Sequence, residues 1–189
     1  MSHRQSSENS LIEKIRSNFH ESKSRTALSL GIGDDAALFR PTVAHETILT
    51  CDWFLEGTHF LRDKHPADSV GWKCLARAVS DIAAMGGAPR CFLMSLALPA
   101  ELTGRWLDDF LGGLHRAAAA FDCVLAGGDT TRRNEILINI TVAGEIKPGQ
   151  ALRRDSARSG DVLFVSGRLG EAEDGLHFMR RTSKKINPR

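Results

Sequence analysis

Aspartates that stand beside glycine-rich or apolar sequence are the residues of this 189-residue chain best suited to chemistry. They are Asp34-Asp35 after Gly31-Ile32-Gly33, Asp52 after Thr47–Cys51, Asp81 within the apolar segment 79–85, and Asp129 after Gly127-Gly128. Carboxylates that converge on one point repel one another unless cations neutralise them. Mg²⁺ binds such hard oxygen ligands together with substrate phosphates. Glycine lets backbone N–H groups approach phosphate oxygens. The pattern is therefore typical of a metal–nucleotide site.

Each aspartate also has a simpler interpretation, because aspartates at strand ends are common turn formers and helix caps. Asp81 fits that interpretation least. Its neighbours Val79 and Ile82 look like core residues, and a buried charge needs a partner or a metal.

Other kinds of site have weaker support. The string Gly31-x-Gly33-x-x-Ala36 fits a relaxed dinucleotide fingerprint, but Pro41 leaves no room for the helix that must follow it. The chain contains no Walker P-loop string and no Gly-x-Ser-x-Gly elbow, and no cysteine has an evident histidine partner. A zinc site made of His59, His65 and a cysteine lacks a spacing motif.

Helical and strand patterns alternate along the chain, which predicts an α/β or mixed α+β fold. Helices are expected over 10–19, over 66–85 with a stop at Gly86-Gly87, and after Thr103, which can cap a helix whose apolar stripe runs from Leu107 to Phe121. Strands are expected over 47–51, 92–98, 124–126, 136–143 and 162–166, with a largely polar connector over 21–30.

Composition is that of an ordinary globular protein, with 42% hydrophobic and 25% charged residues. The net charge of +2 comes from 25 basic and 23 acidic residues, and the last ten residues hold five basic residues and no acidic one. Without them the balance is 20 against 23, or −3, so a nucleic-acid surface is not expected. The apolar stretches are too short to span a membrane, and the polar start (residues 1–10) predicts a cytoplasmic location.

The four cysteines, Cys51, Cys74, Cys91 and Cys123, are too far apart in sequence to make a zinc pair. Three of them stand in apolar surroundings. We interpret them as buried free thiols.

Four strings, in this order, resemble thiamine-monophosphate kinase of the superfamily that includes aminoimidazole-ribonucleotide synthetase. They are GIGDDAA (31–37), DWFLEGTHF (52–60), SDIAAMG (80–86) and GGDTTR (127–132). The resemblance covers roughly residues 10–180. The second string and the Thr-Thr-Arg extension of the fourth point to the kinase in particular.

The resemblance implies that ATP phosphorylates thiamine monophosphate to thiamine diphosphate, with several Mg²⁺ ions. It implies a role for each of nine residues: metal ligands at Asp35, Thr50, Cys51, Asp52, Asp81 and Asp129, ATP contacts at Gly128, Asp129 and Arg154, and a substrate contact at His59. Cys51 stands where Thr or Ser is usual, so its main-chain carbonyl is the expected ligand. Arg153 is the alternative to Arg154. A substrate phosphate is largely a dianion at neutral pH, so no general base is nominated.

The resemblance also implies a domain organisation and a homodimer. An N-terminal helix and connector (1–25) precede an ATP- and Mg²⁺-binding domain (26–147), the start of a truncated second domain (148–180) and a basic tail (181–189). In the ATP- and Mg²⁺-binding domain, a mixed sheet is expected to pack on helices, and strands of this sheet are expected to form a barrel across the dimer interface. Two alternatives stay open: a non-catalytic dimerisation or nucleotide-binding fragment, and a related ATP-dependent synthetase of the same superfamily.

Overall fold

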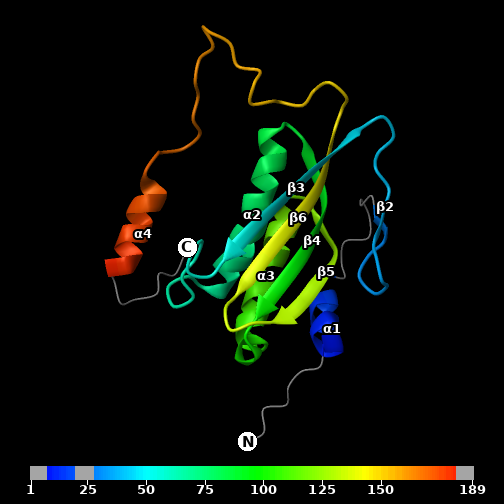
Figure 1. Ribbon diagram of the computed structural model, residues 1–189, viewed down its shortest axis with the longest axis vertical. Helices are drawn as coiled ribbons and strands as arrows, with labels where there is room; N and C mark the ends of the chain where they lie inside the picture. The colour runs from blue at the N-terminus through cyan, green and yellow to red at the C-terminus, as the bar shows by residue number, and fades with distance from the viewer. Residues whose placement is uncertain (1–7, 20–27, 182–189) are drawn as a thin grey trace, which may run out of the picture.

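A four-stranded sheet and two helices form the centre of the molecule in the computed structural model, which describes residues 8–19 and 28–181 (Figure 1). In chain order the elements are α1 (Glu8–Asn18), β1 (Leu28–Leu30), β2 (Leu38–Phe39), β3 (Glu46–Leu55), α2 (Ala67–Ala84), β4 (Ala88–Leu98), a short 3-10 turn η1 (Ala100–Leu102), α3 (Arg105–Ala120), β5 (Val124–Arg132), β6 (Leu137–Ile146) and α4 (Glu171–Arg181).

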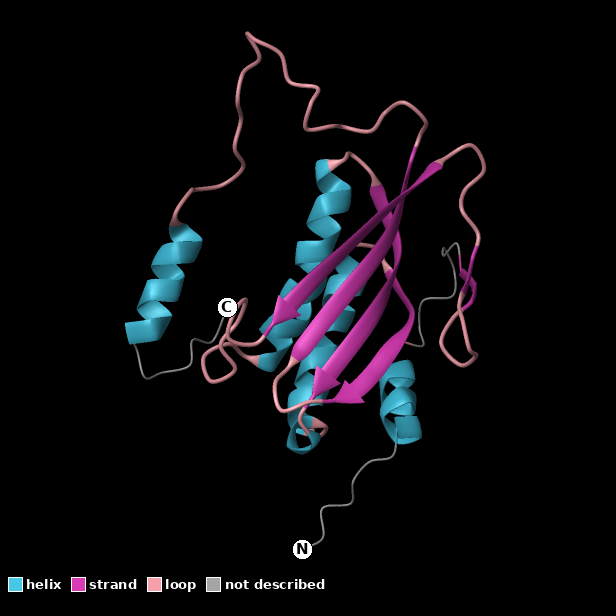
Figure 2. Cartoon of the chain, viewed as in Figure 1, coloured by secondary structure: helices cyan, strands magenta, loops and turns pink. Residues whose placement is uncertain are grey.

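The sheet has the strand order β3-β6-β4-β5, so β3 and β5 are its two edges. β6 is antiparallel to β3 and to β4, whereas β4 and β5 are parallel. A mixed sheet packed on helices, as the sequence predicts, is therefore confirmed. β1 and β2 form a separate antiparallel pair beside it (Figure 2).

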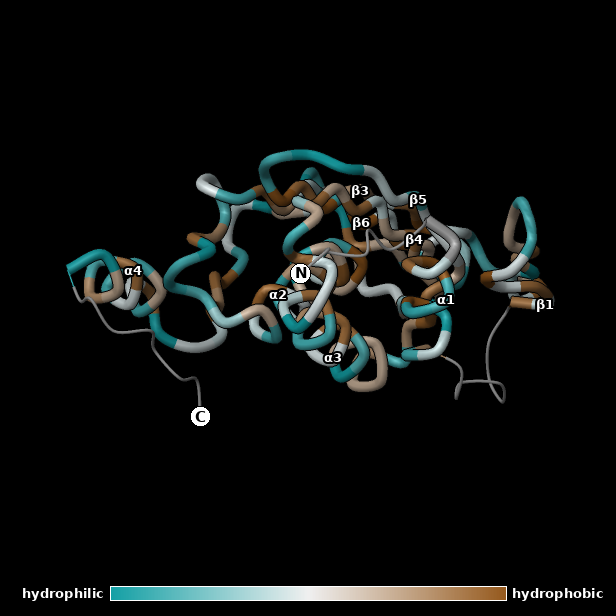
Figure 3. The backbone as a smooth tube through the Cα atoms, turned by 90° about the horizontal axis from the view of Figure 1, so that it is seen from below, coloured by the Kyte–Doolittle hydropathy of each residue, from teal (hydrophilic) through white to brown (hydrophobic). Residues whose placement is uncertain are grey.

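Helices α2 and α3 cover one face of the sheet, and the other face is open (Figure 3). Alternation along the strands explains this, because successive side chains point to opposite faces. On β6, Ile138, Ile140 and Val142 are buried toward the helices. Three large apolar side chains remain exposed on the open face: Leu49 (72%), Trp53 (54%) and Leu93 (45%).

The predicted apolar helix faces are buried in the core. Leu75, Val79 and Ile82 of α2 are buried, as are Leu107, Phe110, Leu111, Leu114 and Ala118 of α3. The prediction that Thr103 caps α3 is wrong. The N-cap is Gly104, because the Thr103 hydroxyl is already used: it donates to the Ala100 carbonyl at the end of the 3-10 turn.

Two strand predictions need correction. β5 does not end at residue 126 but continues through Gly127-Gly128 to Arg132, because its residues keep pairing with β4 as far as Leu98. Residues 162–166 form no strand. They lie exposed in the loop before α4, with Leu163 94% and Phe164 92% exposed. The apolar composition of this segment predicts a strand, but none of the strands in the described part of the chain pairs with it.

Other predictions meet the limits of the described residues. Most of the connector expected over 21–30 lies outside them, and its end forms β1. The basic tail from 182 onward also lies outside them. No helix in the described part of the chain is long and apolar enough to cross a membrane.

The cysteine interpretation is confirmed for three of the four residues. Cys74, Cys91 and Cys123 are buried free thiols, and burial raises the pKa of each. Cys51 is free but exposed.

A buried carboxylate ties the segment before β3 to the sheet. The side chain of Glu145 is 1% exposed. Its oxygens accept hydrogen bonds from the backbone N–H and the hydroxyl of Thr42, both at 2.7 Å, and from Arg90 Nε at 2.9 Å. Burial by itself raises the pKa of Glu145, but the Thr42 hydrogen bonds and Arg90 outweigh it, so the net pKa is lowered.

We expect Glu145→Gln to lower the free energy of unfolding by about 1–3 kcal/mol, because the charge-assisted hydrogen bonds are weakened in a buried place. A lowered pKa in the folded state means that Glu145 contributes its full stabilisation above the unfolded pKa. That contribution is lost as the pH falls through the folded value. Urea unfolding measures the free energy of unfolding of wild type and variant at pH 7 and at pH 3. We expect the two free energies to differ less at pH 3 than at pH 7. Glu46→Gln, at an exposed neighbour, is the control, and a difference independent of pH would contradict the account.

Candidate functional site

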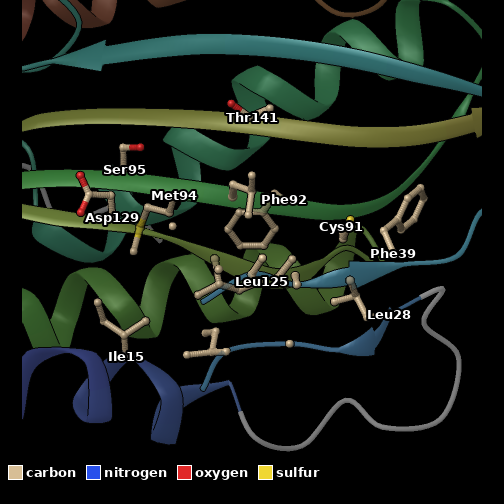
Figure 4. Close-up of a pocket in the computed structure, with 18 of the residues that line it drawn as sticks. Ile15, Leu28, Phe39, Cys91, Phe92, Met94, Ser95, Leu125, Asp129 and Thr141 are labelled. Atoms are coloured by element: carbon tan, nitrogen blue, oxygen red, sulfur yellow. The ribbon is translucent and has the colours of Figure 1, made fainter. Parts of the chain in front are cut away.

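A hollow of about 1050 Å³ lies between the β1–β2 pair, α1 and the open side of the sheet, where β4 and β5 supply most of the strand lining (Figure 4). Leu49 of β3 and Thr141 and Ala143 of β6 also line it. Figure 4 shows Ser95 and Asp129 at one end of this hollow and Leu28, Phe39 and Cys91 at the other. Its polar lining includes Asp34, Asp35, Gly128, Asp129, Thr130 and Thr141. The hollow therefore combines apolar walls with glycines and carboxylates.

Two of the four predicted acidic positions meet in this hollow. The loop between β1 and β2 brings Asp34 and Asp35, and β5 brings Gly128 and Asp129. Gly128 has a positive φ of 154°, and a Cβ there would overlap the Met94 carbonyl, so only glycine allows β5 to lie this close to β4. The side chains of Asp35 and Asp129 are exposed and open to a ligand.

The other predicted metal ligands form a second group, on β3 and α2. Thr50 Oγ1 donates a hydrogen bond to Asp81 Oδ2 at 2.7 Å. Asp52 Oδ2 lies 3.6 Å from Arg77 Nε, an ion pair across the same two elements. Asp81 is exposed, so the expectation of a buried charge there is wrong. The reason is that α2 turns Val79 and Ile82 toward the core and Asp81 away from it.

Cys51 points away from that second group. Alternation along β3 places Cys51 on the open face, where its Sγ lies 3.3 Å from Asn139 Oδ1 and 3.5 Å from Thr141 Oγ1.

Strand order separates Asp129 and the β5 end of the hollow from the second group within one chain. Asp52 stands level with Ile140, Met94 and Gly128, which means that three strand spacings, about 14 Å, divide it from β5. Asp129 stands level with Ser95, Asn139 and Trp53, so it shares the open face with Trp53, whereas Asp52 faces α2. In keeping with this, no three His, Cys, Asp or Glu side chains gather as a metal cluster among the described residues.

Comparison with known protein families shows to which family the chain belongs. The family model described as "AIR synthase related protein, N-terminal domain" matches residues 33–146, more than half of the sequence. The chain belongs to this family. Both the hollow's acidic lining and the second group fall within the matched residues, so the family match covers every predicted site residue except Arg154.

Curated relatives in this family confirm the resemblance to thiamine-monophosphate kinase. The thiamine-monophosphate kinase of Bacillus subtilis is 36% identical over 163 residues, which cover 86% of this chain and 50% of the relative. The chain thus spans about half the length of the curated relatives it matches.

Solved structures agree with the sequence comparison. The crystal structure of thiamine-monophosphate kinase from Stenotrophomonas maltophilia is 38% identical, with a TM-score of 0.76 over 90% of this chain and 52% of that chain. A structure of AaThiL complexed with AMPPCP and TMP is 34% identical, with a TM-score of 0.71 over 100% of this chain and 57% of that chain.

His59 lies in the loop that follows β3. Its Nδ1 accepts a hydrogen bond from the Leu55 N–H at 3.0 Å, and its ring stacks on Phe54 with centroids 5.7 Å apart. The ring is therefore held by a local hydrogen bond. This bond fixes the ring through Nδ1, so Nε2 is the nitrogen that could contact a ligand.

Arg154 is exposed in the segment after β6, beside Arg153, which pairs with Asp155 at 2.8 Å. The Leu152 N–H donates to the Met85 carbonyl at 3.0 Å, which ties this segment to the end of α2. Arg154 thus belongs to the Asp81 side of the molecule rather than to the hollow.

Sequence reasoning missed Arg77, the ion-pair partner of Asp52. A signal was available, because Arg77 precedes Asp81 by four residues and the two therefore share a helix face. It also missed Ser95 and Thr141, since nothing in an apolar strand pattern marks a single polar residue as a lining residue.

Proposed function

We propose that this chain supplies the ATP- and Mg²⁺-binding part of a thiamine-monophosphate kinase, which transfers the γ-phosphoryl group of ATP to thiamine monophosphate. The observation that carries the proposal is the meeting of two glycine–aspartate segments, at 33–35 and 128–129, in one hollow. The AaThiL complex with AMPPCP and TMP supports the choice of ATP and thiamine monophosphate as substrates.

The donor chemistry of both groups fits Mg²⁺, because carboxylate and hydroxyl oxygens are its preferred ligands. Asp35 and Asp129 would hold metal at the hollow, and Thr50, Asp52 and Asp81 at the second group. The Cys51 thiol is a soft ligand that suits Mg²⁺ poorly, so Cys51 would contribute only its main-chain carbonyl. Bound Mg²⁺ would neutralise the charge of the reacting phosphates.

Two copies of the chain bring the hollow and the second group together. Asp52 and Asp129 are too far apart within one chain to bind the same metal ion, and we infer that a partner copy brings them to one nucleotide. On the open face, the exposed Trp53 supplies apolar area for that partner, and Leu49 and Leu93 lie where this face meets the hollow. A homodimer with strands joined in a barrel across this face would have two equal sites, each completed by the second copy.

The protein residues serve to bind and orient rather than to remove a proton. The nucleophile is a phosphate oxygen of thiamine monophosphate, already unprotonated at neutral pH, so no general base is required. The obstacle is the repulsion between two anions. Arg154 would offset it at the ATP phosphates through bidentate hydrogen bonds. His59, with its ring fixed through Nδ1, would hold the second substrate. The cytoplasmic location stays a prediction.

The test is formation of thiamine diphosphate, measured by chromatography, from the purified chain with ATP, thiamine monophosphate and Mg²⁺. We expect product that disappears with EDTA, because the metal shields the phosphates from each other. Product that forms equally well in EDTA would contradict the proposal. Transfer of the ATP phosphoryl group to another acceptor, with none to thiamine monophosphate, would favour the related synthetase.

A second candidate function is a non-catalytic dimerisation or nucleotide-binding fragment. The exposed apolar Trp53 on the open face of the sheet favours the dimerisation role. Binding of MgATP without any product would select this alternative, whereas product would exclude it.

A further inference from the structure

We propose that α1 forms part of the nucleotide site and that Arg16 contacts the phosphates of a nucleotide held in the hollow. The inference rests on the proposed function and extends it to an element that precedes the family match, which begins at residue 33.

α1 is fixed to the centre of the molecule. Lys14 Nζ lies 2.6 Å from Asp108 Oδ1 and donates to the Thr103 carbonyl at 3.1 Å, so it joins α1 to α3 and the turn before it. Ile15 is 6% exposed and belongs to the core. After the helix end, Phe19 packs edge-on against Phe92 of β4, with ring centroids 6.4 Å apart. A helix held in this way keeps its side chains in place before a ligand arrives.

α1 is also a wall of the hollow. Ile12 and Ile15 line it, opposite the β1–β2 loop and β5. One turn of helix separates Ile12 from Arg16, so these two side chains point along the same side of α1. The helix therefore presents an apolar surface to the hollow and a cation to its margin, where Gly33 lies.

The Arg16 guanidinium lies against Gly33 in the glycine–aspartate loop. A Cβ added to Gly33 would meet the guanidinium carbon and its two terminal nitrogens at 3.4 to 3.6 Å. Gly33 has a φ of +132°, a conformation that glycine adopts readily, and the missing side chain leaves room for the guanidinium. Arg16 thus stands at the loop whose next two residues, Asp34 and Asp35, line the hollow.

Arg16 has donors to spare for a ligand. Its ion pair among the described residues is with Glu13, at the long distance of 4.0 Å, and its side chain is 46% exposed. No described ion pair joins it to Asp34 or Asp35. A guanidinium is a planar fork of donors that matches phosphate oxygens, and its charge complements an anion beside carboxylates that hold metal. The simpler role, a basic residue in the last turn of a helix, explains neither its position against Gly33 nor its place beside the hollow.

Calorimetric titration of Arg16→Ala with MgATP and with adenosine tests the inference. We expect MgATP binding to weaken roughly tenfold, the loss typical of one charge-assisted hydrogen bond, and adenosine binding to stay unchanged. Arg16→Lys should recover part of the affinity, because it keeps the charge but not the fork. Arg105→Ala removes an arginine with a 95% exposed side chain on α3 and is the control.

The outcomes separate this inference from the proposed function on which it rests. Wild-type affinity for MgATP in a folded Arg16→Ala chain would overturn the role of Arg16 and leave the proposed function standing. Equal losses for MgATP and adenosine would also overturn it, because they would indicate a purely structural role. A wild-type chain that binds no MgATP would overturn both. Thermal unfolding followed by circular dichroism verifies that the variant is folded.

Discussion

A mixture of Asp52→Asn and Asp129→Asn chains binds MgATP, although each variant alone has lost roughly 10- to 100-fold in affinity. This result follows if each site takes Asp52 from one copy and Asp129 from the other. In a mixed dimer one site then carries both substitutions and the other carries none. Random pairing makes half of the dimers mixed, so about a quarter of the wild-type sites should return.

The measurement is a titration of the mixed chains after joint unfolding and refolding, compared with each variant refolded alone. The control is a mixture of Arg105→Ala and Asp129→Asn chains. The Arg105→Ala chain has an intact Asp52 and Asp129, and its changed side chain is 95% exposed and belongs to neither group. This control shows what simple dilution of a damaged chain gives. A mixture of the two aspartate variants with no regained high-affinity sites would contradict the two-copy account. It would require Asp52 and Asp129 to meet within one chain, against the separation of about 14 Å between β3 and β5.

Gly113→Ala lowers the free energy of unfolding by about 3 kcal/mol or more, because α2 and α3 touch at backbone level there. A Cβ on Gly113 would overlap the Asp68 carbonyl, and a Cβ on Gly71 would overlap the Phe110 carbonyl. The obstructing atoms belong to the backbone of a packed helix and cannot rotate away. The two helices would have to separate, and their separation would loosen the support beneath the sheet.

Gly112→Ala is the matched control one residue away. Its Cβ would meet only an Arg116 nitrogen at 3.9 Å, so alanine there should be neutral or stabilise by up to about 1 kcal/mol through helix propensity. Urea unfolding of both variants gives the comparison. Equal midpoints for the two would mean that the close approach of α2 and α3 does not contribute to stability.

The sequence carried most information where a pattern repeats over many residues. The helical spacing of apolar residues in α2 and α3 and the alternation of apolar residues in β6 are enough to predict these elements, because the spacing itself determines which side chains are buried. It failed where a tertiary partner decides. Gly127-Gly128 looks like a strand end, yet pairing with β4 carries β5 on to Arg132. Residues 162–166 look like a strand, yet none of the described strands pairs with them.

The candidate site was predictable as a set of residues but not as an arrangement. The sequence motifs identify Asp35, Asp52, Asp81 and Asp129 as candidate ligands, but they do not predict that β3 and β5 are opposite edges of the sheet. That order depends on β6 pairing between β3 and β4, a choice made by long-range contacts. The sequence predicts a buried Asp81 for a related reason, because its apolar neighbours one residue away lie on another face of the helix.

Titration of the wild-type chain with ATP, with and without Mg²⁺, tests the central claim most directly. The account predicts saturable binding of one nucleotide per chain in Mg²⁺ and its loss in EDTA, because the carboxylates of the hollow repel the phosphates when no metal lies between them. Affinity for ATP that is the same in Mg²⁺ and in EDTA, or no binding at millimolar ATP, would contradict it.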